Sequence, residues 1–96
     1  MESYIERIEK AVSDFYKVPV NEIYNGHTYV YPFGVAKNTL MYLLYSNGVK
    51  PYDISNNFCV STRLVYRKVS EVQEALKSDT KIRQDIDAIN KMLNNK

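Results

Sequence analysis

The chain has little of what disulfides, metal sites and histidine catalysis require. It contains one cysteine, Cys59, one histidine, His27, and no tryptophan. A single cysteine excludes a disulfide within the chain, and with a single histidine it excludes a zinc site built from Cys and His. A lone histidine also argues against His-dependent acid–base chemistry. We therefore expect no metal, no cofactor and no catalytic residue, and we do not expect an enzyme.

Long apolar runs are also missing from the sequence. No stretch approaches the roughly 18–20 apolar residues that a membrane-spanning helix needs, so no membrane contact is expected. Residues 1–6 are polar and acidic, which predicts no signal peptide and a cytoplasmic location. We expect residues 1–96 to form a single domain, because two cores of half this size would each be too small to be stable.

Glycine and proline occur three times each, and they divide the chain into segments whose apolar residues follow a helical spacing. Ser3 and Glu6 fit a capping box, and Gly48 stands where a left-handed helix cap is expected. Helices are predicted at residues 3–16, 19–24, 35–47, 51–58 and 61–77, with a loop at 25–34 and a last helix that begins at Ser78 or Asp79. The sequence therefore predicts a compact all-α domain of five to six helices.

Positive charge is concentrated in one part of the chain. The net charge is +2, but residues 49–70 hold four basic residues, Lys50, Arg63, Arg67 and Lys68, against one acidic residue, Asp53. A local surplus of one sign is what attracts a polyanion. The alternative interpretation is a chance clustering of basic residues.

The same stretch has the spacing of a helix-turn-helix unit over about residues 51–76. Two helical segments are separated by residues 59–61, and Ser55 is small where the helices must cross closely. Cys59 is expected to be a partly buried filler at this turn. The residues expected to share one core around the helix pair are Leu40, Leu44, Ile54, Phe58, Val65 and Val69.

A helical wheel of the second helix predicts the DNA contacts. The stripe opposite the apolar side consists of Arg63, Tyr66, Arg67 and Ser70, with Thr62 at its edge. Residues expected near base edges are Thr62, Arg63, Tyr66 and Arg67, and residues expected at phosphates are Lys37, Lys50, Ser61 and Lys68. Lys68 borders the buried side and must extend its ammonium outwards. Glu71 and Glu74 repel phosphates, so only the first half of the helix is expected to enter the major groove.

Several stretches follow the order of a known domain. They are VSDFYKV at 12–18 with Glu22-Ile23, KNTLMYLL at 37–44, DISNNF at 53–58, and Ile82, Asp85 and Ile86 in the last helix. On these stretches, residues 8–93 resemble the C-terminal DNA-binding domain of the bacterial replication initiator DnaA. The resemblance implies a Trp-repressor-like helical fold that contains a helix-turn-helix and binds double-stranded DNA in replication or transcription regulation.

The chain departs from this family at the start of the recognition helix. The family signature Gly-Gly-Arg-Asp-His-Thr-Thr-Val is replaced by CVSTRLV at 59–65, which is one residue shorter and keeps only Val65. Ser61, Thr62 and Arg63 stand in place of the family's base-reading residues, and Lys37 replaces a family arginine. We expect a stand-alone, divergent relative that does not read the initiator's own recognition sequence.

A second function remains open, namely a protein-interaction module on the same fold that has lost DNA binding. The aromatic loop at 24–33 carries Tyr24, Tyr29, Tyr31 and Phe33 around His27. These rings fit either a surface for a homodimer or other protein partner, or a cover over one end of the core. Asp85 and Asp87 are interpreted as part of a solvated, mixed-charge helix face.

Overall fold

The computed structural model describes residues 3–26 and 31–94, and within them the chain forms six α-helices and no strand. The helices are α1 (Tyr4–Tyr16), α2 (Val20–Asn25), α3 (Phe33–Ser46), α4 (Pro51–Phe58), α5 (Thr62–Ser78) and α6 (Thr80–Asn94). The expected five- to six-helix all-α class is confirmed. None of the described helices is both long and apolar enough to cross a membrane.

Local sequence signals set the ends of these helices. The Glu6 amide donates to Ser3 Oγ at 3.1 Å and the Ser3 amide donates to Glu6 Oε1 at 3.0 Å, which is the expected capping box of α1. Asp79 Oδ1 accepts from the amides of Lys81 and Ile82 and so caps the start of α6. The predicted boundaries follow from these side-chain acceptors.

The two ends of α3 differ in how closely they match the sequence prediction. The helix begins at Phe33 rather than near residue 35, because the Ala36 amide already donates to the Pro32 carbonyl at 2.9 Å. At the other end Gly48 has a φ of 95°, a left-handed conformation that glycine adopts without strain. The Val49 amide closes this end by donating to the Leu44 carbonyl at 3.0 Å.

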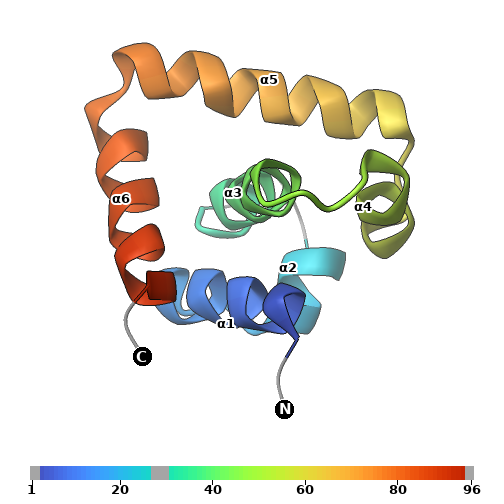
Figure 1. Cartoon of the computed structure of the whole chain (residues 1–96), viewed down its shortest axis with the longest axis horizontal. Coiled ribbons are helices and arrows are strands. Elements are labelled where there is room, and N and C mark those ends of the chain that lie inside the picture. The colour runs from blue at the N-terminus through green and yellow to red at the C-terminus, as the bar shows by residue number, and fades with distance from the viewer. Residues whose placement is uncertain (1–2, 27–30, 95–96) are drawn as a thin grey trace.

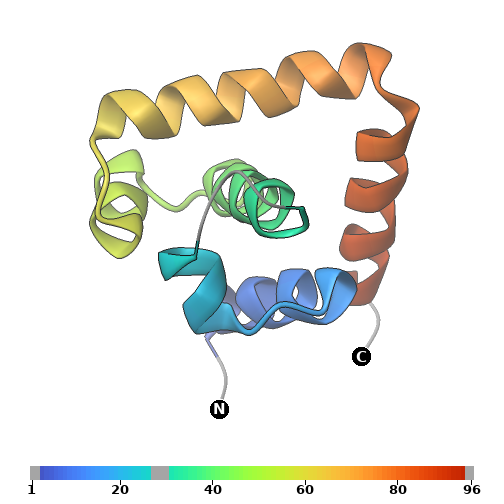
Figure 2. The ribbon, with the colours of Figure 1, turned by 180° about the vertical axis from the view of Figure 1, so that it is seen from behind.

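Helix α3 runs through the centre of the molecule and the other helices surround it (Figure 1). It packs against α1, α2, α4 and α5, and the view from behind shows the same arrangement (Figure 2). Helix α6 packs against α1 and α5 and covers the remaining side. Residues buried on α3 are Ala36, Thr39, Leu40, Met41, Leu43 and Leu44. The six core residues expected around the helix pair are all buried in one cluster.

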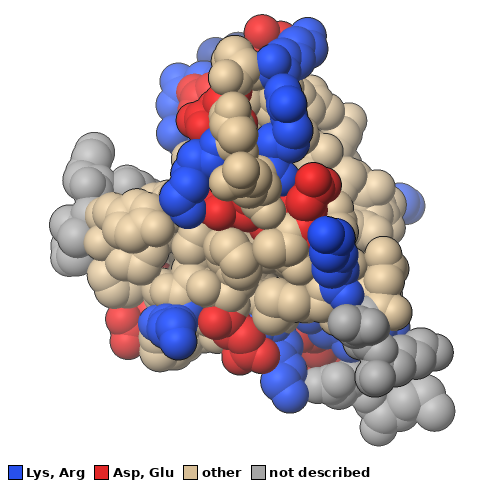
Figure 3. Space-filling view, turned by 90° about the vertical axis from the view of Figure 1, so that its left-hand side faces the viewer, with Lys and Arg blue, Asp and Glu red and all other residues tan. Residues whose placement is uncertain are grey.

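The face formed by α6 carries charges of both signs, as the sequence suggested, and basic and acidic side chains are interspersed on it (Figure 3). The interpretation of Asp85 as part of this solvated face is wrong. Asp85 is only 5% exposed, whereas Asp87 is exposed. Asp85 lies one residue from the buried Ile86 and four from the buried Ile89, so its side of α6 faces the interior.

Candidate nucleic-acid interface

The connection between α4 and α5 has the three residues that the helix-turn-helix spacing predicted. Helix α4 ends at Phe58, and Cys59 follows with a φ of 56°. The Val60 amide donates to the Ser55 carbonyl at 3.0 Å and closes this end of α4. Ser61 then caps α5, because its Oγ accepts from the Leu64 amide at 3.1 Å. The C-terminal end of α4 and the N-terminal end of α5 are therefore both capped by hydrogen bonds that residues of this short turn make.

Cys59 does not fill a gap in the core, and this correction has a simple cause. The residue occupies the left-handed cap position that terminates α4, so its side chain points away from the helix and is exposed. Val60 is partly buried and packs against the core. The inward anchor of the turn is therefore Val60 alone.

Buried side chains hold α4 and α5 together against α3. Ile54, Phe58, Val65 and Val69 are each at most 4% exposed. Ser55 is buried where the helices approach, and its hydroxyl donates to the Tyr52 carbonyl at 2.7 Å, so a small polar residue is accommodated without an unpaired group. The Tyr24 ring lies 4.5 Å, centre to centre, from the Phe58 ring and covers it from α2.

The outer stripe of α5 is exposed as the helical wheel predicted. The side chains of this stripe are all exposed, namely Thr62, Arg63, Tyr66, Arg67 and Ser70. Within the part of the chain that the structure describes, the guanidinium groups of Arg63 and Arg67 form neither ion pairs nor hydrogen bonds with side chains or backbone. Both groups are therefore available to an external acceptor.

Tyr66 is held at one side of this stripe by a residue that the sequence analysis did not single out. Its ring meets the ring of Tyr45, on α3, edge to face, with centroids 6.1 Å apart and planes at 75°. Tyr66 nevertheless remains 51% exposed. The contact orients the phenol along the α3 side of the stripe and leaves it accessible.

The four residues expected at phosphates are in different situations. Lys50 and Ser61 are exposed and are the N-cap residues that directly precede α4 and α5. Lys68 extends outwards as expected, with its side chain 29% exposed and Nζ 3.5 Å from Glu71 Oε1. Lys37 is partly buried, and its Nζ donates to the Gly26 carbonyl at 3.3 Å.

Burial lowers the pKa of Lys37, which reflects the loss of solvent around its ammonium group. The side chain is directed at the end of α2, where Gly26 is the C-cap residue. A phosphate contact by Lys37 stays a prediction, and it requires the ammonium to leave the Gly26 carbonyl.

Charge divides α5 into two halves. The stripe over the first half contains no carboxylate, whereas Glu71 and Glu74 are exposed in the second half. Lys77 pairs with Glu74 at 3.1 Å, so this end of the helix is close to neutral. Among the described residues that belong to α5 itself, positive charges without an acidic partner therefore lie only in its N-terminal half, where a polyanion would meet them.

The aromatic residues at 24–33 that the structure describes do not form a single surface. Tyr24 packs on Phe58 and its hydroxyl donates to the Glu9 carboxylate, and burial together with this bond raises the pKa of Tyr24. Phe33 packs against the core, whereas Tyr31 is 71% exposed. His27 and Tyr29 lie outside the described residues. Of the rings that are described, two cover the core and one faces solvent.

Comparisons with known proteins add no relative to this picture. No family model, no curated protein and no solved structure matches the chain. The case for a function therefore rests on the geometry of α4 and α5 and on the sequence resemblance.

Proposed function

We propose that α4 and α5 form a helix-turn-helix unit that binds double-stranded DNA, with the first half of α5 entering the major groove. The observation that carries the proposal is the pair of exposed arginines, Arg63 and Arg67, free of partners among the described residues and placed just after a three-residue turn. An arginine in this position pairs bidentately with the O6 and N7 atoms of guanine.

The neighbouring groups supply the contacts that position such a helix. Thr62, Tyr66 and Ser61 have exposed hydroxyl-bearing side chains, and Lys50 adds a charge at the first turn of α4. Contacts of this kind to phosphates fix the register of the helix on the duplex without reading sequence. The resemblance to the DNA-binding domain of DnaA supports the same role, in replication or transcription regulation. Since one small module makes few contacts, a homodimer on two half-sites fits the proposal.

The experiment titrates a random DNA duplex with the protein at several salt concentrations, and fluorescence anisotropy of the duplex reports binding. If Arg63, Arg67, Lys50 and their neighbours neutralise three to five phosphates, the log–log salt slope lies near −3 to −5. On a random duplex, which offers no selected site for the arginines to read, both arginines are expected to meet phosphates, so the double variant Arg63→Ala/Arg67→Ala gives a slope that is shallower by about two. Lys77→Ala, in the second half of the same helix, is the matched control and leaves the slope unchanged. Absence of binding at low salt contradicts the proposal.

A protein-interaction module is the second candidate, and one observation favours it. Tyr31 and Tyr52 are 71% and 68% exposed, an unusual exposure for large aromatic side chains. If the duplex titration shows no binding, these two residues become the first to substitute in a search for self-association or a protein partner.

A further inference from the structure

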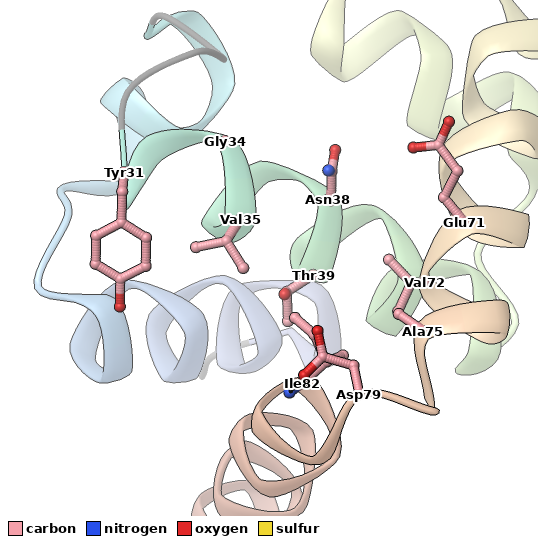
Figure 4. Close-up of a pocket in the computed structure, with 10 residues that line it drawn as sticks. All are labelled: Tyr31, Gly34, Val35, Asn38, Thr39, Glu71, Val72, Ala75, Asp79 and Ile82. Atoms are coloured by element: carbon pink, nitrogen blue, oxygen red, sulfur yellow. Dashed lines mark hydrogen bonds between the residues drawn. The ribbon is translucent and has the colours of Figure 1, made fainter. Parts of the chain in front are cut away.

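Helix α5 packs against α3, and the contact between the two helices differs along α5. Beside the second half of α5, an open pocket lies between Asn38 on α3 and Glu71 and Val72 on α5 (Figure 4). Beside the first half, the ring of Tyr45 on α3 meets the ring of Tyr66 on α5, with centroids 6.1 Å apart. Helix α3 therefore supports the exposed stripe of α5 at Tyr66, in the half of the helix that is proposed to enter the major groove.

Tyr45 is a firm support for the Tyr66 ring. The Tyr45 side chain is partly buried and packs against the hydrophobic core. The planes of the two rings stand at 75°, so the edge of one ring is directed at the face of the other, an arrangement that aromatic pairs prefer. A tyrosine side chain has only two torsion angles, and a contact that restricts them in advance lowers the entropy that is lost on binding. Tyr66 therefore presents a preorganised ring to an approaching duplex.

Tyr66 lies inside the stripe that is proposed to read bases. It follows Thr62 and Arg63 by about one helical turn and directly precedes Arg67, and its side chain is 51% exposed. The arginines are suited to the polar edge of guanine, whereas most of the exposed surface of a phenol ring is apolar. The apolar group that base edges present in the major groove is the C5 methyl of thymine. The ring and the arginines are therefore suited to different bases.

We propose that the Tyr66 ring, positioned by Tyr45, contacts the C5 methyl group of a thymine and makes α5 prefer thymine at one position of its DNA site. This inference rests on the proposed function of α4 and α5, and it adds a base to that function and a positioning residue outside the helix pair. The ring carbons make the contact, so the Tyr66 hydroxyl is not required for it and remains free to meet a phosphate.

The test replaces the thymines of a selected site, one at a time, by 2′-deoxyuridine, which forms the same base pair but lacks the C5 methyl. For the wild type, at least one replacement should weaken binding about fourfold, as the loss of one buried methyl group does. Tyr66→Ala should bind the thymine and the uracil duplex equally at that position. Tyr66→Phe is the matched control, because it keeps the ring, and it should keep the fourfold difference.

Three results would overturn the inference, and they differ in what they say of the proposed function. If the selected site contains no thymine, or if no uracil replacement weakens binding, α5 does not read a thymine methyl, although dependence of the site preference on Arg63 and Arg67 would still support DNA reading. If the protein binds no duplex at low salt, the proposed function and this inference fail together.

The positioning role of Tyr45 has its own test. Tyr45→Leu keeps an apolar side chain beside the core but removes the ring, so the difference between the thymine and uracil duplexes should fall from about fourfold to about twofold or less. Its affinity for a scrambled duplex should stay that of the wild type, and Tyr45→Phe, which keeps the ring, should restore the full difference. If Tyr45→Leu weakens binding to all duplexes by one factor and leaves the thymine preference intact, Tyr45 has a structural role only and does not position Tyr66.

Discussion

The hydroxyl of Tyr16, on α1, donates a hydrogen bond of 3.1 Å to the carboxylate of Asp85, on α6, and both residues are buried. Thr39 Oγ1, on α3, lies 3.4 Å from the same hydroxyl, and Lys81 Nζ lies 3.0 Å from the other carboxylate oxygen. A buried carboxylate is tolerated only when its oxygens are paired in this way. The cluster therefore ties three helices together through polar contacts inside an otherwise apolar core.

Removing the Tyr16 hydroxyl takes away the buried donor to Asp85. We expect Tyr16→Phe to lower the free energy of unfolding by about 1–3 kcal/mol, the cost of a buried acceptor that loses its partner. Tyr52→Phe removes the same atom from a side chain that is 68% exposed, and it should change stability by less than about 0.5 kcal/mol. Urea denaturation of both variants checks this, and equal effects would show that the Tyr16–Asp85 contact adds nothing.

Alkaline pH should destabilise the protein through the same residue. Burial raises the pKa of Tyr16 far above its ordinary value of 10.0, and the charge of Asp85 raises it further. The neutral phenol is thus favoured in the folded state, so its contribution is fully present below pH 10 and is lost as pH rises above 10, where the unfolded chain ionises. The free energy of unfolding should fall by about 1.4 kcal/mol per pH unit for this group. Denaturation of the wild type and Tyr16→Phe between about pH 8 and pH 11 measures the difference, and identical slopes would exclude Tyr16 as the cause.

Phe58 is expected to be the most costly single truncation in the helix pair. It is 4% exposed, and the Tyr24 ring packs directly against it. Phe58→Ala should reduce the free energy of unfolding by about 3–5 kcal/mol, because it removes a large buried ring and leaves a cavity. Denaturant midpoints give the value, and a loss below about 1 kcal/mol would be inconsistent with the packing of α4 on α5.

Helix positions and the exposed stripe of α5 could be predicted from the sequence because both depend on local signals. Ser3, Asp79 and Gly48 cap helices through contacts within a few residues, and the position of Arg63 follows from the helical period alone. The burial of Asp85 could not be predicted, since its partner Tyr16 lies 69 residues away in the chain.

The contacts that side chains make around the candidate interface could not be predicted from the sequence for the same reason. Tyr45 orients Tyr66 across two helices, and Lys37 turns toward Gly26, eleven residues before it. The exposure of Cys59 follows from its left-handed backbone, which the sequence favoured at glycine rather than at cysteine. These contacts depend on long-range packing between helices, which cannot be predicted from the helical spacing of apolar residues.

Lys50 should act on affinity without acting on sequence preference. It is exposed at the start of α4, where a phosphate is the proposed partner. Lys50→Ala is expected to weaken binding to all duplexes about equally and to make the salt slope shallower by about one unit. Lys91→Ala, at the exposed end of α6, is the control with no expected effect. A sequence-dependent loss in Lys50→Ala would place this residue at a base instead.

The central claim is that the first half of α5 reads DNA, and the most direct measurement compares binding to a selected site and to a scrambled one. The site is first obtained by selecting bound sequences from a random pool, and affinities are then measured for the wild type, Arg63→Ala and Arg67→Ala. Each variant should lose about 1–3 kcal/mol of the preference for the selected site, and the preference should relax at one or two base positions. If both variants lose affinity equally on the two duplexes, the arginines contact only phosphates and α5 does not read the sequence.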